Sequence, residues 1–211
     1  MNAPARPPLA GRPGALRLGF GLKPGMRVGL YGGSFDPAHG GHGHVARTAL
    51  QRLDLDRVLW LVSPGNPLKP SGSSQSLERR KLDAARQARG PAMVVSDAER
   101  RLGSRYTLDT VQLLKARFPG VGFVWIMGAD NLAGFHRWRG WTRILAEIPL
   151  AVISRPGFMA KSLFSPMARR FAHARLPAGA ARRLAKAQLP AWIYLTAPLD
   201  PASSTALRVC A

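Results

Sequence analysis

Residues 32–42 of the chain read Gly-Gly-Ser-Phe-Asp-Pro-Ala-His-Gly-Gly-His. The preceding segment, Met26–Tyr31, is strand-like, and residues 45–53 have the pattern of a helix. A glycine-rich turn between a strand and a helix lets backbone N–H groups approach a phosphate, which the helix N-terminus also attracts. His39 and His42 stand three residues apart at that helix start, where both imidazoles can face one anion. The segment therefore predicts a site for a nucleoside triphosphate.

The composition is typical of a globular protein. Of the 211 residues, 46% are hydrophobic and 20% are charged, so the chain is long enough for one domain with a sizeable core. Cys210 is the only cysteine, which excludes an internal disulfide and indicates a reducing compartment. No apolar run has membrane-spanning length, and the first residues lack the apolar stretch of a secretory signal. We therefore expect a soluble, cytoplasmic protein with no membrane partner.

The net charge is +20, from 31 Lys and Arg against 11 Asp and Glu. Such an excess indicates either affinity for phosphate groups or a solvated basic surface. A basic nucleic-acid-binding protein is the alternative from a different functional class. However, the sequence shows neither a helix-turn-helix nor a basic strand motif with interleaved aromatic residues. No specific nucleic-acid partner is therefore expected.

Short apolar runs alternate with helical patterns from Met26 onward. Strands are predicted at 27–31, 57–62, 93–96, 122–127, 150–154 and 192–195, and helices at 42–53, 77–88, 108–118, 141–147, 166–174, 180–187 and 205–208. This alternation predicts a single α/β domain, a doubly wound, Rossmann-like parallel sheet with helices on both faces. We expect the domain to span 26–211, after a disordered, basic leader rich in Pro and Gly at 1–25.

Ligands of such sheets bind beyond the carboxyl ends of the strands, so the segments after the strands are candidate sites. Lys69 follows the second strand and is a point charge suited to a phosphate. Thr107 is a predicted helix N-cap, and the N–H groups at that helix start can hold a carboxylate. Residues 203–208 place hydroxyl groups and an arginine at a further helix start, which predicts a second anion site.

Residues 32–42 closely resemble the signature of the nucleotidyltransferases with a His-x-x-His motif. Further motifs make the chain similar to the bacterial nicotinate-nucleotide adenylyltransferases; they lie at 64–69, 104–110, 128–130, 135–141, 154–157 and 203–208. The resemblance implies that 26–211 is a nucleotidyltransferase domain. It also implies transfer of the adenylyl group of ATP to nicotinate mononucleotide, giving deamido-NAD and pyrophosphate in NAD biosynthesis.

The resemblance also implies residue roles. His39 and His42 are the expected catalytic residues, as preplaced donors that stabilise charge on phosphoryl oxygens. The expected ligands of ATP and its phosphates are Gly33, Ser34, Phe35, Lys69, Gly128, Asp130, Arg155, Ser203, Ser204, Thr205 and Arg208. Those of the pyridine nucleotide are Asn66, Tyr106, Thr107 and Trp138, with the Trp138 ring stacked on the pyridine. Mg²⁺ is expected to bridge the ATP phosphates mostly through water, and no metal held by the protein itself is expected.

Several alternatives stay open. His39, His42 and His44 could supply three zinc ligands, although no acidic or cysteine ligand lies nearby; otherwise His44 is expected at the surface. The same chemistry could use nicotinamide mononucleotide or another phosphate acceptor. Phosphopantetheine adenylyltransferases share the first motif but have Thr in place of His39, and they lack the block from Gly128 to Trp138. Gly43 departs from the family pattern, which usually has an apolar residue there. The sequence also leaves open a homo-oligomer.

Overall fold

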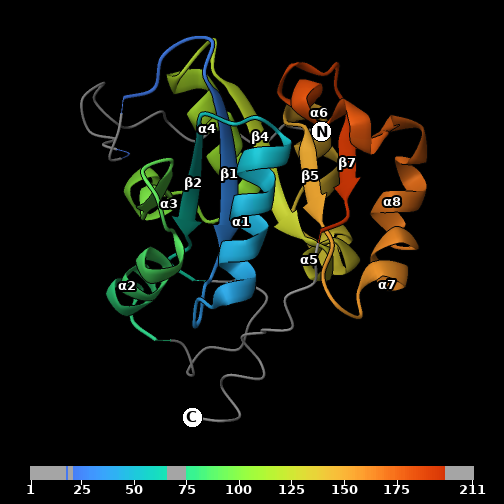
Figure 1. Ribbon diagram of the computed structural model, residues 1–211. Helices are drawn as coiled ribbons and strands as arrows, with labels where there is room; N and C mark the ends of the chain where they lie inside the picture. The colour runs from blue at the N-terminus through green and yellow to red at the C-terminus, as the bar shows by residue number, and fades with distance from the viewer. Residues whose placement is uncertain (1–17, 19–20, 66–74, 198–211) are drawn as a thin grey trace, which may run out of the picture.

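The computed structural model describes residues 18, 21–65 and 75–197. In these residues seven parallel strands form one sheet with the order β3-β2-β1-β4-β5-β7-β6 (Figure 1). The strands are β1 (Arg27–Gly33), β2 (Arg57–Val62), β3 (Met93–Ser96), β4 (Gly122–Gly128), β5 (Leu150–Ile153), β6 (Arg175–Leu176) and β7 (Trp192–Leu195). The predicted doubly wound α/β fold is confirmed, and all six predicted strands are present. The additional strand, β6, has only two residues, too few for a sequence pattern.

The helices agree less well with the prediction than the strands do. They are α1 (Gly40–Arg52), α2 (Leu77–Gln87), α3 (Ala98–Leu102), α4 (Thr107–Arg117), α5 (Ala129–Gly134), α6 (Trp141–Glu147), α7 (Met159–Leu163) and α8 (Pro166–Arg170), with 3₁₀ segments η1 (Phe135–Arg137), η2 (Ala172–Ala174) and η3 (Ala178–Lys186). The prediction missed α3, α5 and α7, because five or six residues are too few to show a helical period. The helix predicted at 205–208 lies outside the described residues.

Two predicted helices are wrong in type or extent. Residues 166–174 form α8 and the separate η2, which are divided at Phe171. Residues 178–186 form the 3₁₀ helix η3 rather than an α-helix at 180–187. Its buried residues, Ala181 and Leu184, are three positions apart, which is the period of a 3₁₀ helix.

Each face of the sheet has its own hydrophobic core. Helices α4, α5, α6 and α8 cover one face and pack on strand residues such as Leu30, Leu61 and Trp125. Helices α1 and α2 and segment η3 cover the other face and pack on Tyr31, Trp60 and their neighbours. Successive strand residues point to opposite faces, so Leu30 and Tyr31 enter different cores. This is why the strands read as continuous apolar runs.

The ordered domain begins before Met26. Leu18 is 3% exposed and belongs to the core under the first face, and Leu22 packs against the same core. The Gly25 N–H donates to the Gly120 carbonyl at 2.8 Å. Leu18, Leu22 and Gly25, which belong to the predicted leader, therefore contact the domain that follows them. Residues 1–17 of the predicted leader lie outside the described residues.

Helix α1 follows β1 after a six-residue connection, residues 34–39, and it packs closely against α2. A Cβ at Gly43 would lie 3.1 Å from the Gln87 carbonyl oxygen at the end of α2. The missing side chain thus allows this close approach, which explains the departure at Gly43 from the family pattern.

The strand order reverses between β1 and β4. After β1 the chain adds β2 and β3 on one side of the sheet, and after β4 it adds β5 on the other side. The crevice between β1 and β4 is therefore the switch point at which such sheets bind ligands.

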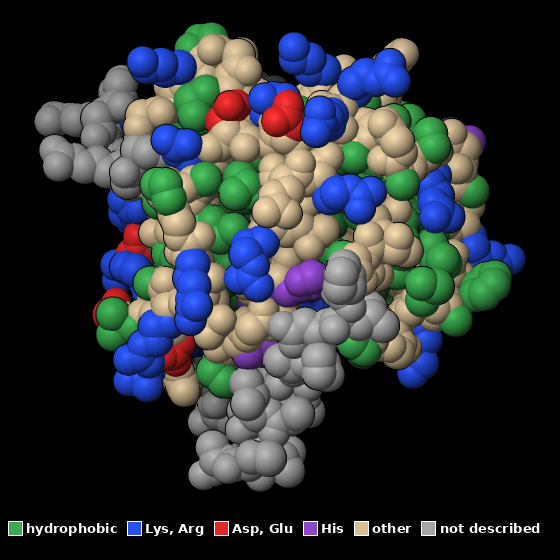
Figure 2. All heavy atoms as spheres, in the orientation of Figure 1, with side chains coloured by type: hydrophobic (Ala, Val, Ile, Leu, Met, Phe, Trp, Pro, Cys, Tyr) green, Lys and Arg blue, Asp and Glu red, His purple; other side chains and the backbone are tan. Residues whose placement is uncertain are grey.

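The face of the molecule that Figure 2 shows is basic without one dominant patch. Figure 2 shows Lys and Arg side chains spread over the visible face, with only a few Asp and Glu side chains among them. This distribution is that of a solvated basic surface. Across the described ranges, no helix has both the length and the apolar character needed to cross a bilayer.

Candidate functional site

Two histidines lie together at the N-terminus of α1. His39 is the N-cap residue, with extended backbone, and His42 lies in the first helical turn. The centroids of their rings are 3.9 Å apart. The backbone N–H of His39 donates to Nδ1 of His42 at 3.2 Å. Because Nδ1 accepts, the proton of a neutral His42 ring is on Nε2, which can donate to a ligand oxygen.

The ring of Phe35 supports His42 from the loop after β1. Phe35 is 2% exposed, and its ring meets that of His42 edge-to-face with centroids 5.1 Å apart. It also packs on Tyr31 and Trp60, at 5.2 and 5.1 Å. The φ of Phe35 is +47°, which is uncommon for a residue with a side chain. Since its ring is buried, Phe35 can meet a phosphate only through its backbone.

Asp130 and Arg155 form an ion pair beyond β4 and β5. Nη1 of Arg155 lies 3.5 Å from Oδ2 of Asp130. Gly128 leaves room for this pair, because a Cβ there would meet the Asp130 carboxylate and lie 2.8 Å from Cδ of Arg155. Burial and the Asp130 carboxylate raise the pKa of the neighbouring Tyr31 phenol, and the Arg155 charge lowers it; the net shift is upward. The phenol therefore stays protonated at neutral pH.

These residues converge because their strands are neighbours. Gly33 ends β1, Gly128 ends β4, and Arg155 follows β5 by two residues. Strands β1, β4 and β5 are adjacent and parallel, so their carboxyl ends lie at one edge of the sheet. The structure thus brings four predicted ligands of ATP and its phosphates, Gly33, Gly128, Asp130 and Arg155, to the same edge as the start of α1.

The predicted pyridine subsite lies between the start of α4 and the segment before α6. The Arg139 guanidinium lies over the Tyr106 ring, 4.6 Å from its centroid. The Trp138 ring is partly buried and meets Trp125 edge-to-face at 6.2 Å. The structure therefore brings the Tyr106 segment and the Trp138 segment together.

The prediction that Thr107 caps α4 is wrong. The N-cap is Tyr106, and Thr107 is the first helical residue. The hydroxyl of Thr110 donates to the Tyr106 carbonyl and to the Glu99 carboxyl group, at 3.3 and 3.2 Å, and so anchors the helix start one residue earlier. The N–H of Thr107 still lies in the first turn, where N–H groups have no intrahelical acceptor.

Six of the predicted ligands belong to parts of the chain that the structure does not describe. Asn66, Lys69, Ser203, Ser204, Thr205 and Arg208 lie outside the described residues, so their roles stay predictions. The Ser34 carbonyl accepts a hydrogen bond from the buried Arg80.

The expected surface position of His44 is wrong: the side chain is partly buried, and its Nε2 is buried without a hydrogen-bond partner. In the described parts of the chain, no group of three or more His, Cys, Asp or Glu could hold a metal ion.

A buried polar cluster lies directly beneath the Tyr106–Thr107 segment. Glu99, in α3, is 8% exposed and accepts from the Thr110 hydroxyl. The Ser104 hydroxyl is 2.9 Å from that of Thr110. Burial raises the pKa of Glu99 to about 7, even though the Thr110 hydrogen bond lowers it. No sequence pattern predicts this cluster, because α3 has only five residues, too few to show a helical period.

Comparison with known proteins places this geometry in a family. Residues 30–209 match the model of the cytidylyltransferase-like family. A relative from Caulobacter sp. (strain K31), named "Probable nicotinate-nucleotide adenylyltransferase", is 65% identical over 183 residues, which cover 87% of this chain and 97% of that protein. Proteins of the same name from Cereibacter sphaeroides and Methylorubrum extorquens are 50% and 52% identical over 87% of this chain, covering 96% and 99% of their own lengths.

A solved structure shows the same fold. It is the Plasmodium falciparum nicotinic acid mononucleotide adenylyltransferase, determined in complexes with APC and with NaAD. The match has a TM-score of 0.63 at 15–16% identity and covers 87% of this chain and 83% of the solved chain. At this identity the likeness concerns the fold alone.

The raised pKa of Glu99 predicts a pH-dependent stability. Between about pH 4.5 and 7 the folded protein holds a proton on Glu99 that the unfolded chain has lost, so stability falls as the pH rises through this window. The Glu99→Gln variant should lack this fall, which amounts to roughly 3 kcal/mol for the shift in pKa. Urea unfolding at a series of pH values measures the difference from wild type.

The exposed Glu78 is the matched control for this experiment. Glu78→Gln should keep the wild-type dependence of stability on pH. A Glu99→Gln protein whose stability follows the wild-type curve between pH 4.5 and 7 would show that Glu99 does not hold a proton in the folded state.

Proposed function

Because this chain belongs to the cytidylyltransferase-like family and, within it, to the nicotinate-nucleotide adenylyltransferases, we propose that it transfers the adenylyl group of ATP to nicotinate mononucleotide. The products are deamido-NAD and pyrophosphate, so the reaction is a step of NAD biosynthesis. The observation that carries the proposal is the close pair of imidazoles, with ring centroids 3.9 Å apart, at the N-terminus of α1, beside the switch point of the sheet.

In this reaction a phosphate oxygen of the mononucleotide attacks the α-phosphorus of ATP. A new P–O bond forms, and the bond between the α-phosphorus and the bridging oxygen to the β-phosphorus breaks. Negative charge gathers on the phosphoryl oxygens and on the leaving pyrophosphate, where preplaced donors lower the barrier. Nε2–H of His42 is such a donor, because its Nδ1 is engaged by the His39 N–H. The α1 N-terminus adds a partial positive charge, and no covalent nucleophile is required.

The pyridine subsite accounts for the choice of acceptor. The first-turn N–H groups of α4, which begins at Thr107, can donate hydrogen bonds to the carboxylate of nicotinate. A neutral amide would gain less from the partial charge of the helix end. The Trp138 ring would lie against the pyridine, and the Arg139 guanidinium adds positive charge over Tyr106.

We also propose that Mg²⁺ enters the site bound to ATP. At this edge of the sheet the Asp130 carboxylate is paired with Arg155. Because this carboxylate is already paired, the ATP phosphates and water would supply most of the ligands of the ion. The intracellular substrates and the single cysteine, Cys210, fit a cytoplasmic enzyme.

The choice of substrate is tested by pyrophosphate release with ATP and each pyridine mononucleotide in turn. We expect kcat/KM to be higher with nicotinate mononucleotide than with nicotinamide mononucleotide, because only the former presents a carboxylate to α4. A clear preference for the amide would overturn this assignment. Steeply salt-dependent DNA binding without any pyrophosphate release would instead favour a nucleic-acid-binding protein.

Replacing His42 by Ala removes the proposed Nε2–H donor. Turnover should fall about 10²–10³-fold, as for the loss of other preplaced charge-stabilising donors. His44→Ala, two positions along the same helix, is the matched control and should keep wild-type turnover. Melting temperatures are measured alongside, because His42 also accepts the hydrogen bond from His39. Near-normal turnover of a folded His42→Ala enzyme would remove His42 from the mechanism.

A further inference from the structure

Arg80 is a buried cation that the reaction scheme leaves without a role. It lies on α2, and the residue is 2% exposed. Its guanidinium donates to four backbone carbonyls: those of Ser34 and Ser63 from Nη1 at 2.8 and 2.7 Å, that of Pro64 from Nη2 at 3.3 Å, and that of Gln75 from Nε at 3.1 Å. Burial lowers the pKa of Arg80, whereas the nearby Asp36 and Glu78 carboxylates raise it; the net shift is downward. One side chain thus joins three separate segments.

The bond to Ser34 orients the peptide unit that precedes Phe35. In a trans peptide the carbonyl and the N–H of the same unit point in opposite directions. Because the Ser34 carbonyl is held on Arg80, the Phe35 N–H points away from Arg80. In the described part of the chain this N–H donates to no acceptor. It is therefore available to an anion, in the loop that also carries the unusual φ of +47° at Phe35.

The bonds to Ser63 and Pro64 tie the loop after β2 to the loop after β1. These carbonyls come directly after β2, which ends at Val62. The chain then continues toward Asn66 and Lys69, the predicted ligands of the pyridine nucleotide and of phosphate. Arg80 therefore fixes the point at which that segment leaves the sheet, relative to the loop that leads to His39 and His42.

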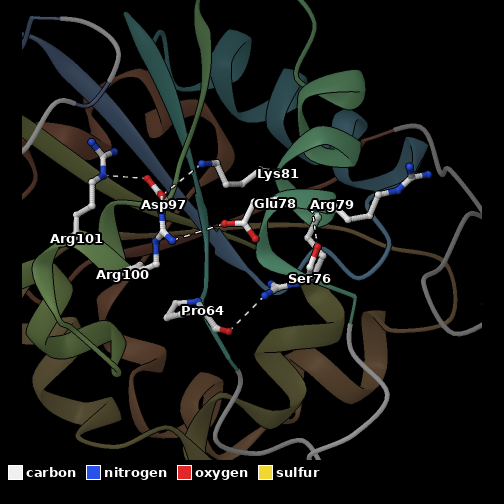
Figure 3. A network of polar contacts seen from close by, with 9 residues as sticks. Pro64, Ser76, Glu78, Arg79, Lys81, Asp97, Arg100 and Arg101 are labelled. Carbon is white, nitrogen blue, oxygen red and sulfur yellow. Dashed lines mark hydrogen bonds and ion pairs between the residues drawn. The ribbon is translucent and has the colours of Figure 1, made fainter.

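Helix α2, which carries Arg80, is itself anchored on its other side. Figure 3 shows Lys81, Arg100 and Arg101 directed at Asp97, and Glu78 paired with Arg100. Asp97 is 6% exposed. Although burial raises its pKa, the hydrogen bonds from Arg100 and Lys81 and the nearby positive charges hold it below the usual value. The same figure shows the Pro64 carbonyl turned toward the helix, where it accepts from Arg80. The ion pairs of Lys81 and Glu78 therefore hold the helix that carries Arg80 against the segment that contains Asp97 and Arg100.

We propose that Arg80 is a positioning residue for adenylyl transfer. It sets the Ser34–Phe35 peptide unit so that the Phe35 N–H faces the phosphates of ATP, and it holds the loops after β1 and β2 in one arrangement. The role in turnover rests on the proposed function; the effect on nucleotide binding does not. Lysine cannot replace arginine here, because a single ammonium group lacks the planar fork that reaches four carbonyls from three nitrogens.

The test compares Arg80→Lys, Arg80→Met and the matched control Arg79→Met in the full chain. Arg79 is the adjacent, exposed residue of the same helix, and its side chain pairs only with Asp83 among the described residues. Titration calorimetry measures the affinity for α,β-methylene-ATP with Mg²⁺, which requires no acceptor. Pyrophosphate release gives kcat and KM with ATP and nicotinate mononucleotide, and melting curves give the folded fraction.

Both Arg80 variants should bind the analogue at least about tenfold more weakly and lose about 10²-fold in kcat/KM per folded molecule, as misplaced catalytic groups do. Arg79→Met should stay within about twofold of wild type in both measurements. Millimolar guanidinium should partly restore the kcat/KM per folded molecule of an Arg80→Ala protein. It should leave the kcat/KM of Arg79→Ala unchanged.

The proposal is overturned if folded Arg80→Lys keeps the affinity and kcat/KM of wild type. It is also overturned if the losses disappear after correction for the folded fraction, or if Arg80→Lys does not fold at all, since Arg80 then serves stability alone. A wild-type protein that releases no pyrophosphate with either mononucleotide would refute the proposed function. In that case, weaker analogue binding by Arg80→Lys would still support a role of Arg80 in arranging the loops for nucleotide binding, and the role in adenylyl transfer would be overturned.

Discussion

The hydrogen bond from the His39 N–H to Nδ1 of His42 decides which nitrogen of His42 can meet a ligand. It forms because His39 is the extended N-cap of α1 and His42 lies in its first turn. Phe35, in the loop between β1 and α1, packs edge-to-face on the His42 ring. The parallel strands β1, β4 and β5 then bring Gly128, Asp130 and Arg155 to the same edge of the sheet. The histidine pair at the start of α1 and the Asp130–Arg155 ion pair therefore share one edge of the sheet.

Two buried polar groups lie next to the segments that carry the predicted ATP and pyridine ligands. Arg80 holds the loop before His39 and the loop after β2 through backbone carbonyls. Thr110, with Glu99 and Ser104, anchors the start of α4 at Tyr106. Buried polar groups are costly unless they are hydrogen-bonded, and each of these meets that requirement through hydrogen bonds to a backbone segment at the predicted site.

The sequence was sufficient for the sheet and for the motifs at the strand ends, because apolar runs and glycine-rich turns are local signals. Thr107 shows the limit of local reasoning: its residue type favours a cap, but the tertiary contacts of Thr110 move the helix start to Tyr106. Arg80 stands in the basic run Arg79–Lys81 and reads as part of a solvated helix face. Its burial depends on loops that are distant along the chain, so no pattern in α2 could reveal it.

The most direct test of the account is the ¹⁵N NMR spectrum of the five imidazoles before and after addition of α,β-methylene-ATP with Mg²⁺. The account predicts that neutral His42 carries its proton on Nε2, and that the resonances of His39 and His42 shift on binding while those of the distant, exposed His173 do not. A His42 ring protonated on Nδ1, or His39 and His42 resonances unchanged at saturating nucleotide, would contradict it.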